Sequence, residues 1–227
     1  MNLKIKNSTA TSADVFIYGD IVDDGWKWFE SDIAPADIKD QLDGLKGKEL
    51  HFYINSGGGD VFAGTAIHNM IKRHDAKTIG HVDGVAASIA SVILMACDEI
   101  EVPANAYVMI HRPMGGTFGN VDDHLKMCDV LETIEEGIIS TYQLHTDLEK
   151  EELSAMMDAE TWMTGDQFAE KFSNGVTLLD PVQAVACATD QQHKRWPHAI
   201  QQPSKGSDPE NSVDLEKMKL EVELALM

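Results

Sequence analysis

The sequence predicts an α/β fold, and two observations support this class. Short segments rich in β-branched and aromatic residues alternate with segments whose apolar residues recur every three or four positions. These segments follow one another in the order strand, helix, strand, helix, strand, which is typical of a sheet with crossover connections. At 227 residues, the chain is long enough to bury one sizeable core and to carry an appendage.

The first third of the chain contains two strand–helix units. A strand is predicted at VFIYGDI (15–21), which alternates and is rich in β-branched and aromatic residues. A helix is predicted over 34–47, with Pro35 in the first turn, where proline is favoured. A second strand, ELHFYINS (49–56), runs into a glycine-rich turn, and the helix expected after it covers 61–74.

The middle of the chain continues this alternation. A short strand is predicted at KTIGHV (77–82) and a helix at AASIASVILMAC (86–97). Two further strands, EIEV and AYVMIH, fall within 99–111. Apolar residues at steps of three and four then predict one long amphipathic helix over 121–147.

Two shorter helices are predicted beyond that long helix. The first is EELSAMMD (151–158), and the second is TGDQFAEKF (164–172). Thr164 and Gln167 have the spacing of a capping box, in which each side chain satisfies a backbone N–H at the start of a helix. The capping box therefore fixes where the second of these helices begins.

The composition divides the chain into four parts. An N-terminal segment (1–13) precedes one main domain (14–186), and a polar, proline-containing linker is expected at 187–212. The last part, 213–227, returns to helical spacing and is predicted to be an amphipathic tail helix. An isolated helix of this length is marginal in water, so its stability depends on docking.

The charge balance and the cysteines exclude several classes of function. The formal net charge of -20 argues against nucleic acid or an anionic membrane as the main partner, because binding phosphate needs a surplus of basic residues. Cys97, Cys128 and Cys187 form no CxxC pattern, which indicates neither a disulfide framework nor a zinc site, and two of them are interpreted as core residues. No segment has the length of a signal peptide or a membrane span, so a cytoplasmic location is expected.

Ser88 is the first candidate for chemistry. It follows the small residues of DGVAA and begins an apolar segment predicted to be a helix. Taken alone, such a serine is more simply interpreted as a small residue at a tight packing site. The alternative is a nucleophile whose small neighbours leave room for a substrate.

Three other features favour the second interpretation when they are taken together. INSGGGD (54–60) opens a strand into three consecutive glycines, which can aim backbone N–H groups at an anion. His111 ends an apolar strand, and the acids Asp158 and Glu160 precede the helix predicted at 164–172. A hydroxyl, a base, an acid and N–H donors form a complete set for acyl transfer, and this set requires no metal or organic cofactor. The N–H of Ile89, at the predicted helix start, would be one donor.

The motifs and their order resemble those of the ClpP-like serine peptidases, and most closely the phage and prophage branch associated with head maturation. The similarity covers roughly residues 14–182 and rests on three stretches: INSGGGDVFAGTAIHNMIKRH, DGVAASIASVILMACDEIEVPANAYVMIHRP and AETWMTGDQFAEKFSNGVTLLD. The resemblance implies a crotonase/ClpP-like fold of repeated β-α units, with the long helix as a protruding handle. It also implies a homo-oligomer of stacked rings in the cytoplasm of a bacterial host.

The resemblance also implies a role for each candidate residue. Ser88 would be the nucleophile and His111 the general base. Glu160 occupies the place of the third, acidic member, where the housekeeping relatives carry Asp, and Asp158 stays as the alternative acid. The oxyanion hole would be formed by the backbone N–H groups of Gly59 and Ile89.

One position in the glycine turn departs from the family pattern. Gly57 stands where the family usually has proline, a change that frees the unfolded chain and is expected to cost stability. The two glycines that follow it are retained. We therefore expect function to survive this departure.

Polypeptides are the implied substrates, and the implied partners are a separate ATPase unfoldase or capsid and scaffold proteins. Two other functions compete with the peptidase. An acyl-CoA enzyme of the crotonase fold would share the oxyanion hole but would usually lack a Ser-His pair. A non-catalytic capsid-assembly or scaffold-binding protein would use the linker and tail helix and would need neither Ser88 nor His111.

Overall fold

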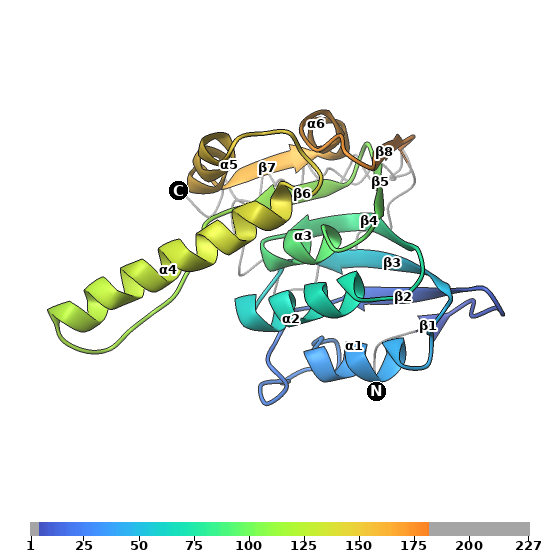
Figure 1. The fold of residues 1–227 in the computed structure, drawn as a ribbon, viewed down its shortest axis with the longest axis horizontal. Coiled ribbons are helices and arrows are strands. Elements are labelled where there is room, and N and C mark those ends of the chain that lie inside the picture. Colours follow the sequence, from blue (N-terminus) through green and yellow to red (C-terminus); the bar gives the residue numbers. More distant parts are fainter. Residues whose placement is uncertain (1–4, 182–227) are drawn as a thin grey trace, which may run out of the picture. The chain divides into compact units, whose positions relative to one another are not determined.

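A mostly parallel eight-stranded sheet organises the structure, a computed structural model that describes residues 5–181 (Figure 1). The predicted α/β class is confirmed, because the neighbouring strands β2, β3, β4, β5 and β8 all run parallel. The strands are β1 (Ile5–Lys6), β2 (Ser12–Tyr18), β3 (Glu49–Ser56), β4 (Thr78–Ala87), β5 (Glu99–Pro103), β6 (Tyr107–Ile110), β7 (Thr161–Thr164) and β8 (Val176–Leu179).

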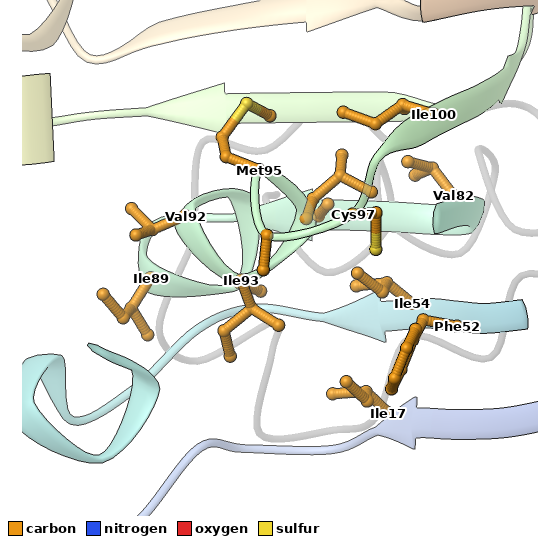
Figure 2. Packing of buried hydrophobic residues seen from close by; sticks show 14 of the residues in the cluster. Ile17, Phe52, Ile54, Val82, Ile89, Val92, Ile93, Met95, Cys97 and Ile100 are labelled. Carbon is orange, nitrogen blue, oxygen red and sulfur yellow. The ribbon is translucent and has the colours of Figure 1, made fainter. Parts of the chain in front are cut away.

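Helices connect these strands, and α1, α2 and α3 lie side by side along one face of the sheet (Figure 1). The core lies between this helical layer and the sheet. Figure 2 shows Phe52 and Ile54 of β3 in one cluster with Ile93 of α3, and all three are fully buried. The helices are α1 (Pro35–Leu42), α2 (Val61–Lys72), α3 (Ile89–Leu94), α4 (Val121–Tyr142), α5 (Lys150–Asp158) and α6 (Gly165–Lys171).

Strand β4 has two different neighbours on one side, and this fork positions the candidate site. Its first half pairs with β5 (Ile79↔Glu99), whereas its last residues pair with β6 (Ala86↔Val108). Because both β4 and β6 run in the same direction, their carboxyl ends meet at one edge of the sheet. Ser88 follows the end of β4 and His111 follows the end of β6, so the topology brings the two residues to the same edge.

Several predicted boundaries differ from the structure. β3 matches its prediction residue for residue, but Ala86 and Ala87 belong to β4 and not to the helix predicted at 86–97. Their pairing with β6 outweighs the helical propensity of alanine, and α3 is correspondingly short. The long helix α4 ends at Tyr142 instead of residue 147. Strands β1, β7 and β8 were not predicted, since two to four residues give almost no periodic pattern.

The handle predicted over 121–147 corresponds to α4, whose exposed first turns extend away from the sheet (Figure 1). Only Ile138, Ile139 and Tyr142 of this helix are buried, whereas Val121 is 73% exposed. Among residues 5–181, no helix is long and apolar enough to cross a membrane.

The cysteine interpretation needs one correction. Cys97 is fully buried, as expected of a core residue, but Cys128 is exposed on α4. Cys187, the linker at 187–212 and the tail helix at 213–227 lie outside the described residues.

Candidate active site

Ser88 occupies a strained turn between β4 and α3. Its backbone has φ 55° and ψ -130°, a left-handed conformation that is rare for residues other than glycine. Its N–H donates to the carbonyl of Met109 at 2.9 Å, which fixes the turn against β6. Strain of this kind costs of order 1–3 kcal/mol and concentrates at functional sites. A sharp strand-to-helix turn also presents the nucleophilic serine of α/β-hydrolases.

The structure brings Ser88 and His111 together. The Ser88 hydroxyl oxygen and the His111 Nε2 are 2.7 Å apart, within hydrogen-bond distance. Both residues are half-buried, so the pair is partly shielded from water and still accessible. This contact has the geometry that a histidine needs to take a proton from a serine hydroxyl.

The glycine turn predicted at 54–60 lies directly against this pair. Gly58 has φ +93°, and a Cβ added there would be 2.7 Å from both the Ala87 carbonyl oxygen and the Ser88 Cβ. Only a residue without a side chain therefore fits between β3 and Ser88. The turn is held in place by the Ser56 hydroxyl, which accepts from the Gly58 N–H at 3.1 Å and donates to the Gly19 carbonyl at 2.6 Å.

The two candidate oxyanion donors are both available. A short parallel bridge joins Ile21 to Gly59, but it uses the Gly58 carbonyl and the Asp60 N–H and leaves the Gly59 N–H unused. Ile89 is the first residue of α3, where the N–H has no partner within the helix. Within residues 5–181, neither the Gly59 nor the Ile89 N–H donates to a protein acceptor.

The contacts of the two candidate acids differ. Asp158 pairs with Arg112 at 3.3 Å, whereas the exposed Glu160 carboxylate accepts from the Trp162 Nε1 at 3.4 Å. Strands β6 and β7 are antiparallel, with Ile110 opposite Thr161, so His111 and Glu160 each lie one residue beyond the end of this register. Opposed residues of an antiparallel pair have their Cβ atoms about 5 Å apart. The register therefore favours Glu160, and the acid stays a prediction.

Sequence reasoning missed the polar groups that contact the backbone of Ser88. The Ser91 hydroxyl donates to the Ser88 carbonyl at 2.6 Å and lies 2.8 Å from the Tyr142 hydroxyl on α4. Burial raises the pKa of Tyr142, so its hydroxyl remains a neutral hydrogen-bonding group. Ser91 was visible in the motif around Ser88. Its link to Tyr142 joins distant parts of the chain, and no local pattern predicts it.

Arg112 and Glu135 were also missed. Arg112 directly follows His111, and its Nε lies 3.1 Å from a carboxylate oxygen of Glu135 on α4. A signal for Glu135 existed in the sequence: it lies four and three residues from Leu131 and Ile138, within the apolar stripe of the long helix. An acid in such a stripe indicates a partner of opposite charge.

Comparison with known proteins identifies the family. A family model described as Clp protease matches residues 9–172, which include Ser88, His111 and Glu160. The chain belongs to the Clp protease family.

Individual relatives agree with this assignment. The Clp family member from Deinococcus radiodurans, an ATP-dependent Clp protease proteolytic subunit, is 32% identical over 122 residues, covering 53% of this chain and 60% of that protein. Subunits of the same name from Bacteroides thetaiotaomicron and Bacteroides fragilis are each 31% identical over 126 residues. These two matches cover 57% and 61% of the relatives. The chain thus matches less than two thirds of the length of each Clp relative.

Proposed function

We propose that this chain is a serine endopeptidase that cleaves polypeptides through Ser88 and His111. The observation that carries the proposal is the 2.7 Å contact between the Ser88 hydroxyl and the His111 Nε2, made at a serine with positive φ. The Ser-His pair distinguishes this proposal from an acyl-CoA enzyme of the crotonase fold. It also argues against a scaffold protein, because binding alone needs no such pair.

The proposed reaction has two halves. Ser88 Oγ attacks the carbonyl carbon of a peptide bond while His111 Nε2 takes the hydroxyl proton, and the carbonyl π electrons move to oxygen. The resulting oxyanion accepts hydrogen bonds from the N–H groups of Gly59 and Ile89. Collapse of this intermediate breaks the C–N bond, and His111 donates its proton to the leaving amine. Water then attacks the acyl-enzyme by the same route, releasing the acid product and restoring Ser88.

The third member of the triad is proposed to be Glu160. A carboxylate beside the second ring nitrogen of His111 would hold the imidazole in the required orientation and stabilise its cation. The β6–β7 register supports Glu160 as this acid. Asp158 instead forms an ion pair with Arg112. Glutamate is one methylene longer than the aspartate of the housekeeping relatives, and the positive φ of Glu160 (48°) changes the direction from which it approaches.

The assembly and its setting are also proposed from the family. The relatives are named as proteolytic subunits of an ATP-dependent protease, and we infer that this chain likewise forms stacked rings around an enclosed chamber. The exposed apolar residues of α4, such as Val121 and Leu125, are the proposed ring-to-ring contact. A phage or prophage role in head maturation, with capsid or scaffold substrates, is the proposed setting, and an ATPase unfoldase is the other proposed partner.

A fluorophosphonate probe tests the proposed nucleophile. The purified full chain should be labelled at Ser88, and Ser88→Ala and His111→Ala should each abolish labelling because the first lacks the nucleophile and the second its base. Circular dichroism and the oligomeric state serve as controls for folding. A folded, oligomeric wild-type protein that resists the probe would overturn the peptidase proposal and favour the scaffold function.

A further inference from the structure

Arg112 connects the residue after His111 to two helices. Strand β6 ends at Ile110, one residue before His111. The next anchor is Arg112, whose N–H donates to the Met157 carbonyl at 3.2 Å. Its guanidinium pairs with Glu135 on α4 at 3.1 Å and with Asp158 on α5 at 3.3 Å. The backbone that carries His111 is therefore held from one side by α4 and α5.

The Arg112 side chain is 52% exposed, and Glu135 is the more buried partner of this pair. Its side chain is only 12% exposed, although its neighbours on α4 are mostly open to solvent. One carboxylate oxygen accepts from Ser154 Oγ at 2.7 Å, and the other faces Arg112. A partly buried carboxylate with both oxygens engaged fixes its partner much more firmly than an exposed ion pair does. The contact of Arg112 with Asp158, whose side chain is 68% exposed, is correspondingly weaker.

We propose that Arg112 and Glu135 are positioning residues that hold His111 within hydrogen-bond distance of Ser88. This inference rests on the proposed function, because it assigns these residues to the same reaction. Glu135 fixes the guanidinium, the guanidinium fixes the backbone at 112, and the adjacent imidazole is thereby set at 2.7 Å from Ser88 Oγ. A displacement of about 1 Å at a reacting group can cost on the order of 100-fold in rate. Any movement of α4 at Glu135 is therefore transmitted to the catalytic base.

The same two helices offer a matched control. Lys150 of α5 pairs with Glu136 of α4 at 2.7 Å, one residue from Glu135. This pair also joins α4 to α5, but its side chains are 53% and 66% exposed and it does not involve Arg112. Glu136→Gln therefore removes an α4–α5 link of the same chemical kind without touching the connection to His111.

The test compares fluorophosphonate labelling rates of the full-length chain and of Glu135→Gln, Arg112→Gln, Arg112→Lys and Glu136→Gln. We expect Glu135→Gln and Arg112→Gln to slow labelling by about 10-fold or more at the pH optimum. Arg112→Lys, which keeps the charge but not the planar fork, should recover part of that loss. Glu136→Gln should label at the wild-type rate. The melting temperature and the oligomeric state of each variant are measured as well, so that labelling rates are compared only between folded, assembled proteins.

A crystal structure of Glu135→Gln gives a second readout that does not depend on activity. We expect the Ser88 Oγ to His111 Nε2 distance to exceed hydrogen-bond range while β4 and β6 stay paired. Wild-type labelling rates in folded Glu135→Gln and Arg112→Gln would overturn this inference and leave the peptidase proposal intact. If Glu135→Gln does not fold, Arg112→Gln and Arg112→Lys decide by the same criteria. Absence of labelling in the wild type would instead overturn the proposed function, and with it this inference.

Discussion

Gly58 is the position at which the fold and the proposed chemistry are most tightly coupled. In Gly58→Ala, the new Cβ would be 2.7 Å from the Ala87 carbonyl oxygen and from Ser88 Cβ, and 3.2 Å from the Ile89 nitrogen. The first two distances are about 0.8 Å short of an ordinary contact of ~3.5 Å. All of these neighbours are backbone or the nucleophile's own Cβ, so relief requires moving the turn that carries Ser88.

Two costs add in this variant. A left-handed φ costs an alanine roughly 1–2 kcal/mol relative to glycine, and overpacking at such a site costs roughly 1–3 kcal/mol. The sum, about 2–5 kcal/mol of unfolding free energy, corresponds to a fall in melting temperature of roughly 4–20 °C for a domain of this size. Because the displaced groups include Ser88 and the Ile89 N–H, we also expect labelling by the fluorophosphonate probe to slow by about 100-fold.

Thermal unfolding and labelling kinetics, measured below the melting temperature of the variant, test both effects. Gly137→Ala is the control: a Cβ there meets nothing within 4 Å, and helix propensity should stabilise α4 by about 1 kcal/mol. Its labelling rate should equal that of the wild type. A Gly58→Ala protein with wild-type melting temperature and labelling rate would refute the claim that this turn lies against the nucleophile.

Two further predictions concern other parts of the structure. Burial lowers the pKa of His81, whose Nε2 lies 3.0 Å from His51 Nδ1 on β3. Below the usual histidine pKa of about 6.5, the folded state therefore binds fewer protons than the unfolded state. Unfolding free energy should therefore fall as pH drops from 7.5 to 5.5, by at most ~1.4 kcal/mol per pH unit for this group. Urea titrations of His81→Gln should show a shallower dependence, and an unchanged slope would contradict the assignment. Tyr142→Phe removes the hydroxyl facing Ser91 and should cost about 1 kcal/mol of unfolding free energy in the same assay, whereas unchanged stability would show that this hydrogen bond contributes nothing.

The sequence predicted those parts of the site whose positions depend on residues close together in the chain. His111 was predicted at the end of an apolar strand and Ser88 at the start of the helix after another strand, and the strand ends of a parallel sheet meet at one edge. The glycine run before α2 was visible for the same reason. Residue type and position along a strand were sufficient in these cases.

Other parts depend on pairings between distant segments, which no periodic pattern contains. Strand β4 pairs first with β5 and then with β6. The pairing with β6 places Ala86 and Ala87 in a strand, although alanine favours helix. The ion pair of Arg112 with Glu135 joins a strand end to the middle of a long helix. Strand β7, which directly follows Glu160, has only four residues and exists because β6 offers it a free edge.

The shortness of α3 changes the physical basis of the proposed oxyanion hole. The sequence suggested that a long helix beginning near Ser88 would stabilise negative charge through its positive N-terminal end. The structure gives α3 only six residues, less than two turns, so few peptide dipoles are aligned there. Stabilisation must then come mainly from direct hydrogen bonds of the Ile89 and Gly59 N–H groups, whose strength depends steeply on geometry. The strained backbone of Ser88 and the tight contact of Gly58 are the features that set this geometry, which makes the turn around Ser88 more important to the proposed catalysis than the helix that follows it.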